Sequence, residues 1–246
     1  MLIALISDIH GNTDAMEASL AKAEELGAQR YVFLGDLVGY GAEPERVVRR
    51  IKDYVERSAV ALMGNHDSAV LGTTAGMNRV AAIALDWTRR NLSENAKAFL
   101  SGLPLSHREE DRLFVHASAD RPELWDYVLD AEAARASLMA TDASITFCGH
   151  VHVPALYCLS QTGKLISHTP STDVAIPLGP HRRWLAVVGS VGQPRDGKPS
   201  ASFALYNTDE RTLTYRRAPY DVEAAAAKIR AAGLPEMLAV RLSVGR

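Results

Sequence analysis

The sequence predicts an α/β fold in which two mixed β-sheets face each other and helices flank them. In the first half of the chain, short apolar runs alternate with amphipathic helical patterns, which is typical of parallel strands joined by right-handed crossovers. In the second half, strand patterns follow one another across turn sequences, which is typical of an antiparallel sheet. With 246 residues and no repeat or linker, residues 1–246 are expected to form a single domain.

The first half is predicted to contain three strands and the helices between them. Three short apolar runs are the predicted strands: residues 2–6, 31–34 and 59–63. The first strand leads into a helix that is expected to end at Gly27, and Pro44 is expected to open the next helix. Helical periodicity then predicts helices over 78–92 and from Ser93 to Leu100.

The second half begins with a short strand over 113–115, a helix that Asp130 caps, and an apolar strand over 143–147. From residue 155 the pattern changes to strands linked by turns. Four of them are expected to form a second, mainly antiparallel sheet: residues 155–159, 184–188, 203–206 and 212–215. Alanine-rich helical sequence from about residue 221 closes the chain.

Composition excludes several classes of protein. The formal net charge is −2, so the chain offers no basic stripe for duplex nucleic acid. Its only cysteines, Cys148 and Cys158, lie in apolar runs and are expected to be buried free thiols. No stretch approaches the length of a membrane span, and the apolar N-terminal run is too short for a signal peptide. We therefore expect a cytoplasmic protein that does not bind membranes.

Residues with metal-binding side chains gather at the ends of the predicted strands. Seven such residues occur there: Asp8, His10, Asp36, Asn65, His116, His150 and His152. His150 and His152 are separated by one residue, so in an extended segment both imidazoles face the same way. The crevice outside strand carboxyl ends is where open α/β sheets place their sites. Seven ligands exceed the needs of one ion and suit two divalent ions, such as Mn²⁺, Fe²⁺, Zn²⁺ or Ni²⁺.

These residues occur in an ordered set of motifs. The set comprises Asp8-Ile9-His10, Gly35-Asp36, Gly64-Asn65-His66-Asp67, His116 and Gly149-His150-Val151-His152. Over roughly residues 1–195 the chain resembles the calcineurin-like metallophosphoesterases, and in particular their small bacterial and archaeal phosphodiesterase branch. The resemblance implies that one ion is held by Asp8, His10, Asp36 and His152. It implies that a second is held by Asp36, Asn65, His116 and His150, with Asp36 as the bridge.

The resemblance also implies the reaction. A hydroxide that bridges the two metals would attack a phosphate ester, most simply a phosphodiester of a small molecule, in line with the leaving group. His66 is not a ligand in the family, and it would protonate the leaving oxygen or hydrogen-bond to the phosphate.

The second motif departs from the phosphoprotein phosphatase branch, which continues Gly-Asp-x-x-Asp-Arg-Gly. Here Gly39 stands where the aspartate would orient the catalytic histidine, and Tyr40 stands where the arginine would grip phosphate. This departure argues against a phosphoprotein phosphatase. It leaves Asp67, the carboxylate adjacent to His66 in the sequence, as the candidate catalytic partner of that histidine.

The phosphate-binding arginine has two candidates. Arg121 follows the His116 segment, and Arg195 lies in a glycine-rich turn over 189–195. The three tryptophans, Trp87, Trp125 and Trp184, are expected to serve packing.

Two other functions compete with the phosphodiesterase. A dinucleoside polyphosphate hydrolase would use the same metals on an anhydride and would need a basic groove for the additional phosphates. A protein-binding scaffold of the same fold would have lost a ligand or the catalytic histidine, and every such position is filled here. The sequence leaves the oligomeric state open, with a homo-oligomer among the options.

Overall fold

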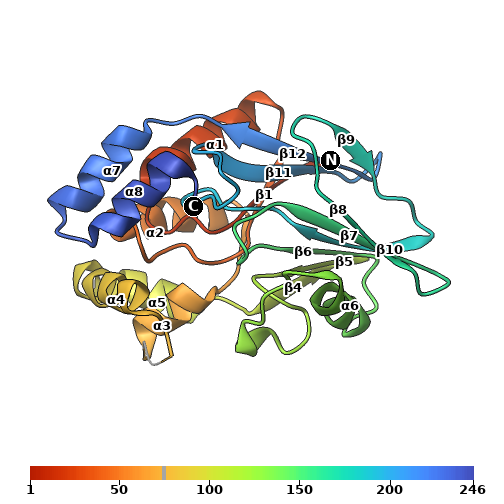
Figure 1. The fold of residues 1–246 in the computed structure, drawn as a ribbon, viewed down its shortest axis with the longest axis horizontal. Helices are drawn as coiled ribbons and strands as arrows, with labels where there is room; N and C mark the ends of the chain where they lie inside the picture. Colours follow the sequence, from red (N-terminus) through yellow and green to blue (C-terminus); the bar gives the residue numbers. More distant parts are fainter. Residues whose placement is uncertain (74–75) are drawn as a thin grey trace.

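The computed structural model describes residues 1–73 and 76–246, and its strands form two six-stranded sheets that face each other (Figure 1). Helices α1 and α2 cover the outer side of the first sheet, and α6 covers the outer side of the second. The predicted fold class, two mixed sheets flanked by helices, is confirmed.

The first sheet has the strand order β3-β2-β1-β11-β12-β9. Its strands are β1 (Leu2–Ile6), β2 (Arg30–Phe33), β3 (Val60–Ala61), β9 (Ala175–Pro177), β11 (Ala201–Asn207) and β12 (Thr212–Ala218). The pairs β1·β2 and β2·β3 are parallel, as their helical crossovers predict. The pairs β1·β11, β11·β12 and β12·β9 are antiparallel.

The second sheet has the order β4-β5-β6-β10-β7-β8. Its strands are β4 (Ser106–Glu109), β5 (Arg112–Val115), β6 (Ile145–Cys148), β7 (Ala155–Ser160), β8 (Leu165–His168) and β10 (Arg182–Val187). Strand β6 runs parallel to both β5 and β10, so this sheet is mixed as well.

The predicted grouping of the late strands is wrong. Strands β7 and β10 lie in the second sheet, whereas β11 and β12 extend the first sheet, with Ile3 of β1 opposite Tyr206 of β11. The strand over 143–147 lies in the second sheet as β6. All of β6 and most of β11 are buried, and such uniformly apolar strands carry no alternation that could specify a partner.

The helices are α1 (Thr13–Glu25), α2 (Pro44–Val55), α3 (Asn65–Leu71), α4 (Arg79–Asn91), α5 (Glu94–Ser101), the 3₁₀ turn η1 (Pro122–Leu124), α6 (Ala131–Met139), α7 (Val222–Ala231) and α8 (Glu236–Val244). Most of them fall close to their predicted positions, whereas α3 and the 3₁₀ turn η1 were not predicted. Ser93 and Asp130 cap α5 and α6 through hydrogen bonds from backbone N–H groups, as the sequence predicts. Within the described residues, no helix is long and apolar enough to cross a membrane.

Three apolar layers hold the two sheets and the helices that cover them together. The central layer lies between the sheets and contains Leu5, Phe147 and Tyr206. A second layer joins the first sheet to α1 and α2, and a third joins the second sheet to α6. Cys148 and Cys158 are buried and free, as predicted. The packed sheets bring the carboxyl ends of β1, β2, β3, β5 and β6 together at one end of the sheets, where residues that follow these strands hydrogen-bond to one another.

Candidate metal centre

The backbone turns sharply where these strands end. Five residues of the predicted site have left-handed φ values: Asp8 (55°), His10 (51°), Asp36 (51°), His150 (66°) and His152 (64°). This conformation is uncommon and costly for residues other than glycine, and it concentrates at functional sites where surrounding structure maintains it. The turns direct the five side chains toward one another. Asn65 opens α3 after β3, and His116 follows β5 directly.

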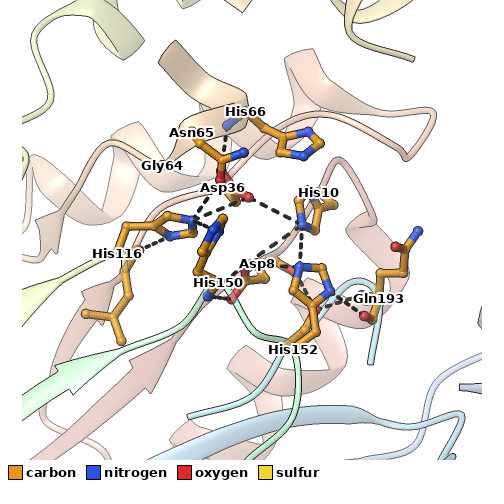
Figure 2. A network of polar contacts seen from close by, with 12 residues as sticks. Asp8, His10, Asp36, Gly64, Asn65, His66, His116, His150, His152 and Gln193 are labelled. Carbon is orange, nitrogen blue, oxygen red and sulfur yellow. Dashed lines mark hydrogen bonds and ion pairs between the residues drawn. The ribbon is translucent and has the colours of Figure 1, made fainter. Parts of the chain in front are cut away.

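The first group of side chains joins the ends of β1, β2 and β6. Asp8, His10, Asp36 and His152 are all buried, and one potential ligand atom of each lies within 4.8 Å of the others. The His152 Nε2 atom is 3.3 Å from Asp8 Oδ1, and His10 Nε2 is 3.6 Å from Asp36 Oδ2. Figure 2 shows these groups converging on a common point.

The second group shares Asp36 with the first. It contains Asp36, His116 and His150, again buried and with ligand atoms within 4.8 Å of one another. The His116 Nε2 atom is 3.5 Å from Asp36 Oδ2, 3.2 Å from Asn65 Oδ1 and 3.2 Å from His150 Nδ1 (Figure 2). All seven residues predicted as ligands therefore meet, in two groups that join at Asp36.

Backbone carbonyl groups fix the orientation of three imidazoles. The Nδ1–H groups of His10, His116 and His152 donate to the carbonyl oxygens of Val38 (3.2 Å), Leu34 (2.7 Å) and Gln193 (2.6 Å). A carbonyl oxygen only accepts, so Nδ1 carries a hydrogen in each ring and Nε2 is the atom that faces the site.

Because both rings donate from Nδ1, the Nε2 atoms of His10 and His152 face each other, and they are 3.1 Å apart. Two lone pairs at this distance repel unless a cation or a proton lies with them. Metal-binding histidines in proteins characteristically donate their other N–H in this way. The donor set thus fits divalent metal ions.

The electrostatics of the site also favour positive charge. Burial alone would raise the pKa of Asp8, but the facing imidazoles, His152 above all, hold it well below its usual range. Burial alone would lower the pKa of His116, but the Asp36 carboxylate outweighs it and raises that pKa to about 9. The buried carboxylates thus stabilise positive charge on His116, whereas burial lowers the pKa values of His10 and His150.

His66 lies beside this centre on the first turn of α3. Its backbone N–H donates to Asp36 Oδ1 at 2.8 Å, and its ring packs 4.8 Å from the ring of His10 and 4.5 Å from that of Tyr40. Within the described residues its buried Nδ1 atom has no hydrogen-bond partner. A Cβ atom built on Gly39 would lie 2.3 Å from this Nδ1. Gly39 thus lies next to the His66 ring, at the position where phosphoprotein phosphatases carry the orienting aspartate, but glycine supplies no carboxylate there.

Asp67 does not hydrogen-bond to the His66 ring, so it does not orient that ring as the missing aspartate would. Its carboxylate accepts hydrogen bonds from the backbone N–H groups of Leu37 (3.0 Å), Val38 (3.1 Å) and Gly64 (2.9 Å). Burial, reinforced by the nearby Asp36 charge, raises the pKa of Asp67 to about 7. Asp67 therefore ties the segment after β2 to the start of α3. Its predicted catalytic role stays a prediction.

The two candidate arginines differ in position. The Arg195 backbone N–H donates to the His152 carbonyl oxygen at 3.2 Å, and its guanidinium lies 6.0 Å from the ring centroid of Tyr40. The Arg121 side chain is 62% exposed and lies 3.7 Å from Asp120. Arg195 is therefore the arginine beside the centre.

Sequence reasoning missed several residues that surround the site. Gln193 orients His152 through its backbone carbonyl, a group that every residue has, so no side-chain pattern could reveal it. The ring of Tyr127 stacks on His150 with centroids 3.9 Å apart, and the ring of Trp125 meets His116 edge to face at 5.9 Å. Trp125, expected only to serve packing, thus also contacts the site. The sequence around Trp125 did not indicate this contact, because the contact depends on how the loop after η1 folds back against His116.

A buried Asp/His cluster with a shared carboxylate, at the edge of two facing α/β sheets, is the arrangement of a metal-dependent hydrolase. Comparison with known proteins identifies the family. A model of the calcineurin-like phosphoesterase superfamily domain matches residues 1–211. The chain belongs to this superfamily, as the motifs predict.

The chain is also similar to individual proteins along its whole length. An uncharacterized protein of Methanocaldococcus jannaschii is 35% identical over 251 residues, which cover 100% of this chain and 98% of that protein. The crystal structure of a metallophosphoesterase from Sphaerobacter thermophilus has a TM-score of 0.89 and 34% identity, with both chains covered completely. A hypothetical protein from Pyrococcus horikoshii, at 20% identity, shares the fold with a TM-score of 0.80, over 100% of this chain and 98% of that one.

The chain also matches part of an enzyme whose activity is known from its name. The symmetrical bis(5'-nucleosyl)-tetraphosphatase of Bordetella pertussis is 31% identical over 128 residues, which are 46% of this chain and 42% of that enzyme. The match thus covers less than half of either protein.

Proposed function

We propose that this protein is a phosphoesterase that uses two divalent metal ions to hydrolyse small phosphate esters, most readily phosphodiesters. The observation that carries the proposal is the sharing of Asp36 by two groups of buried ligand atoms. A carboxylate offers two oxygens and can serve one ion with each. Membership of the calcineurin-like superfamily supports the same reaction class.

We assign one metal ion to each of the two groups of buried side chains that share Asp36. Asp8, His10, Asp36 and His152 hold one ion, and Asp36, Asn65, His116 and His150 hold the other. Mixed carboxylate, imidazole and amide donors suit Mn²⁺, Fe²⁺, Zn²⁺ or Ni²⁺. When bound, such ions polarise the phosphoryl group and activate water at neutral pH.

The other residues bind and orient the substrate. Arg195 contacts the phosphate, and His66 donates a proton to the leaving oxygen. Burial lowers the pKa of His66, whereas the neighbouring Asp36 carboxylate acts in the opposite direction. The negative charge of a bound ester favours the protonated ring further. Asp67 keeps α3 and the segment after β2 in register, which positions His66.

The preference for diesters rests on the charge available to the phosphate. A monoester dianion benefits most from an additional arginine, but Tyr40 occupies that position in the motif. A diester carries one negative charge less, and the single nearby guanidinium of Arg195 suffices. We therefore expect little action on phosphoproteins.

Dinucleoside polyphosphate hydrolysis is the second candidate, because of the partial similarity to the Bordetella pertussis tetraphosphatase. Such a substrate carries several additional phosphates that need cationic partners. Among the described residues, those lining the cavity beside the centre include no lysine or arginine. This favours an ester over a polyphosphate.

A metal-reconstitution experiment tests the function. Metal-free protein is loaded separately with Mn²⁺, Fe²⁺, Zn²⁺ and Ni²⁺, and hydrolysis of bis(p-nitrophenyl) phosphate, p-nitrophenyl phosphate, a phosphopeptide and diadenosine tetraphosphate is measured. We expect close to two ions per chain and the highest kcat/KM on the diester. A higher kcat/KM on the tetraphosphate would favour the second candidate. Hydrolysis of none of these substrates by protein with two ions would support a scaffold.

The role of His66 is tested by the leaving group. A proton donor matters most when the departing alcohol is a poor leaving group, and general acid catalysis is worth about 10²–10⁴ in rate. His66→Ala should lose that factor on alkyl or nucleoside diesters and much less on nitrophenyl esters, with metal content unchanged.

The exposed His181 provides the matched control, and His181→Ala should retain full activity. Equal losses of His66→Ala on both classes of ester would mean that His66 binds phosphate and donates no proton.

A further inference from the structure

A cavity of about 640 Å³ opens beside the metal centre. Asn65, His66 and His150 belong to its lining, so the cavity and the centre are continuous. The volume lies within the range of small-molecule sites. The proposed phosphate position at the ions leaves this space for the organic part of the substrate.

The cavity is lined in comparable measure by polar groups and by aromatic and apolar side chains. Among the described residues that line it, none is a lysine, arginine, aspartate or glutamate. Asn65, Ser68 and Asn78 contribute polar groups, and the aromatic and apolar side chains include Tyr40, Met77, Ala81, Leu124, Trp125 and Tyr127. Apart from the proposed proton donor His66, a phosphate chain would meet no cationic side chain among the described lining residues, whereas a neutral planar group would bury its faces against the rings.

Two of these rings are held by the metal centre itself. One face of Tyr127 stacks on His150 at 3.9 Å with an interplanar angle of 19°, yet Tyr127 remains 49% exposed. Trp125 is braced against His116 at 5.9 Å. Each ring thus has a fixed position and part of its surface open for contact. Aromatic side chains of this kind stack with nucleic-acid bases of any sequence.

The backbone of this loop is also fixed. Trp125 has a φ of 59°, a left-handed value that is exceptional for a bulky side chain. Val128 is 2% exposed and packs among the residues that join α6 to the second sheet, and it thereby anchors the loop next to Tyr127. Strained residues persist where the surrounding structure maintains them, and they cluster at ligand-binding sites.

We propose that this cavity binds the base of a nucleotide ester, with Tyr127 and Trp125 stacking on it while its phosphate lies at the metal centre. The inference rests on the proposed function and narrows its substrate to the nucleotides. It assigns Tyr127 and Trp125 to substrate specificity, a role that the seven metal ligands and His66 do not supply.

Calorimetry with two product-like ligands tests the proposal. AMP and ribose 5-phosphate carry the same phosphate and sugar, neither is a diester, and only AMP has a base. The metal-loaded protein should bind AMP about tenfold more tightly, which corresponds to about 1.4 kcal/mol. Tyr127→Leu and Trp125→Leu should each reduce this ratio severalfold, whereas Tyr127→Phe should preserve it because the ring remains.

Leu129→Ala is the matched control, since Leu129 is 66% exposed on the same loop and does not line the cavity. Equal affinity for both ligands in the unaltered protein would overturn the inference. So would an equal loss for both ligands in Tyr127→Leu, which would mean that Tyr127 acts only through His150. Diester hydrolysis without a base preference overturns this inference alone. A base preference in a protein that hydrolyses no ester overturns the proposed reaction alone.

Discussion

His66 is positioned by packing, without a carboxylate to orient it. The rings of His10 and Tyr40 lie 4.8 Å and 4.5 Å from it, and Gly39 leaves the space that its Nδ1 atom occupies. The φ of Gly39 is +90°, which also disfavours any other residue there. At the scale of single residues, the absence of a side chain at Gly39 is what allows the imidazole to reach the metal centre.

Gly39→Ala tests this arrangement. The new Cβ atom would meet His66 Nδ1 at 2.3 Å and displace the ring. A misplacement of about 1 Å in a catalytic group can cost about 10²-fold in rate. We expect kcat on a phosphodiester to fall by about this factor, with the metal content, measured by elemental analysis, unchanged.

Gly163→Ala is the control for backbone strain. Gly163 has a φ of +80°, and a Cβ atom there would meet nothing within 4 Å. Its substitution should cost about 1 kcal/mol of stability and leave kcat intact. If both variants lost activity equally, strain rather than contact with His66 would be the cause.

The residues that meet in the centre could be predicted because their chemistry is visible in the sequence. Asp8, His116 and His152 are metal-binding types at strand ends, and the topology brings such ends together. Tyr127 and Gln193 could not be predicted. One acts through a ring contact and the other through a carbonyl group, and both contacts depend on loop conformations that local sequence does not specify.

At the scale of elements, α3 carries both Asn65 and His66 and has only seven residues. A helix this short has little stability of its own. Arg89 of α4 satisfies its C-terminal carbonyl groups, donating to Val70 at 2.8 Å, Ala69 at 2.8 Å and Gly72 at 3.1 Å. A cation at this end also complements the helix dipole.

Removing this cap should affect both stability and catalysis. Arg89→Met is expected to reduce the free energy of unfolding by about 1–2 kcal/mol, because three carbonyl groups lose their charged donor. It should also lower kcat, since α3 positions His66. Arg90→Met alters the next residue, which is exposed, and should change stability by less than about 0.5 kcal/mol. Urea unfolding and diester kinetics measure both effects, and indistinguishable variants would contradict the capping role.

Most elements could be predicted, but their partners in the sheets could not. Helices α2, α5 and α6 have visible start signals in Pro44, Ser93 and Asp130. The edge strands β4 and β8 were not predicted, because their residues are mostly polar or half-exposed and lack a clear apolar pattern. Which sheet β10 and β11 join depends on contacts between segments that are distant in the sequence. A buried apolar strand can pair within either sheet, so its sequence alone does not specify which one.

At the scale of the whole molecule, the C-terminal helices close the fold on the side of the first helices (Figure 1). Leu238 of α8 and Ile229 of α7 belong to one apolar cluster with Tyr40 and Ala84. Lys228 adds a polar link, since its Nζ atom lies 2.7 Å from both Asp14 of α1 and Glu43 before α2. Residues 222–244 therefore brace the helices that follow the Asp8 and Asp36 strand ends.

The link through Lys228 should depend on pH. Burial alone would raise the pKa of Glu43, but hydrogen bonds from Lys228 and Thr13 lower it below its ordinary value of 4.5. A carboxylate whose pKa is lower in the folded state stabilises the fold above the unfolded pKa, and this contribution is lost as the pH falls through the folded pKa. Lys228→Met should therefore destabilise metal-free protein at pH 7 by about 1 kcal/mol, a modest value because the Lys228 side chain is 36% exposed. The penalty should shrink toward zero below pH 4.5.

Lys22→Met is the matched control, because Lys22 forms only an exposed i,i+3 pair with Glu25 and should change stability by a few tenths of a kcal/mol. Urea unfolding of both variants across pH 3.5–7 measures the difference. A penalty in Lys228→Met that did not vary with pH would mean that the lysine stem acts through packing against α1 and α2. Apolar packing alone would then hold α7 and α8 against the first helices, and the ion pairs of Lys228 with Asp14 and Glu43 would contribute nothing to stability.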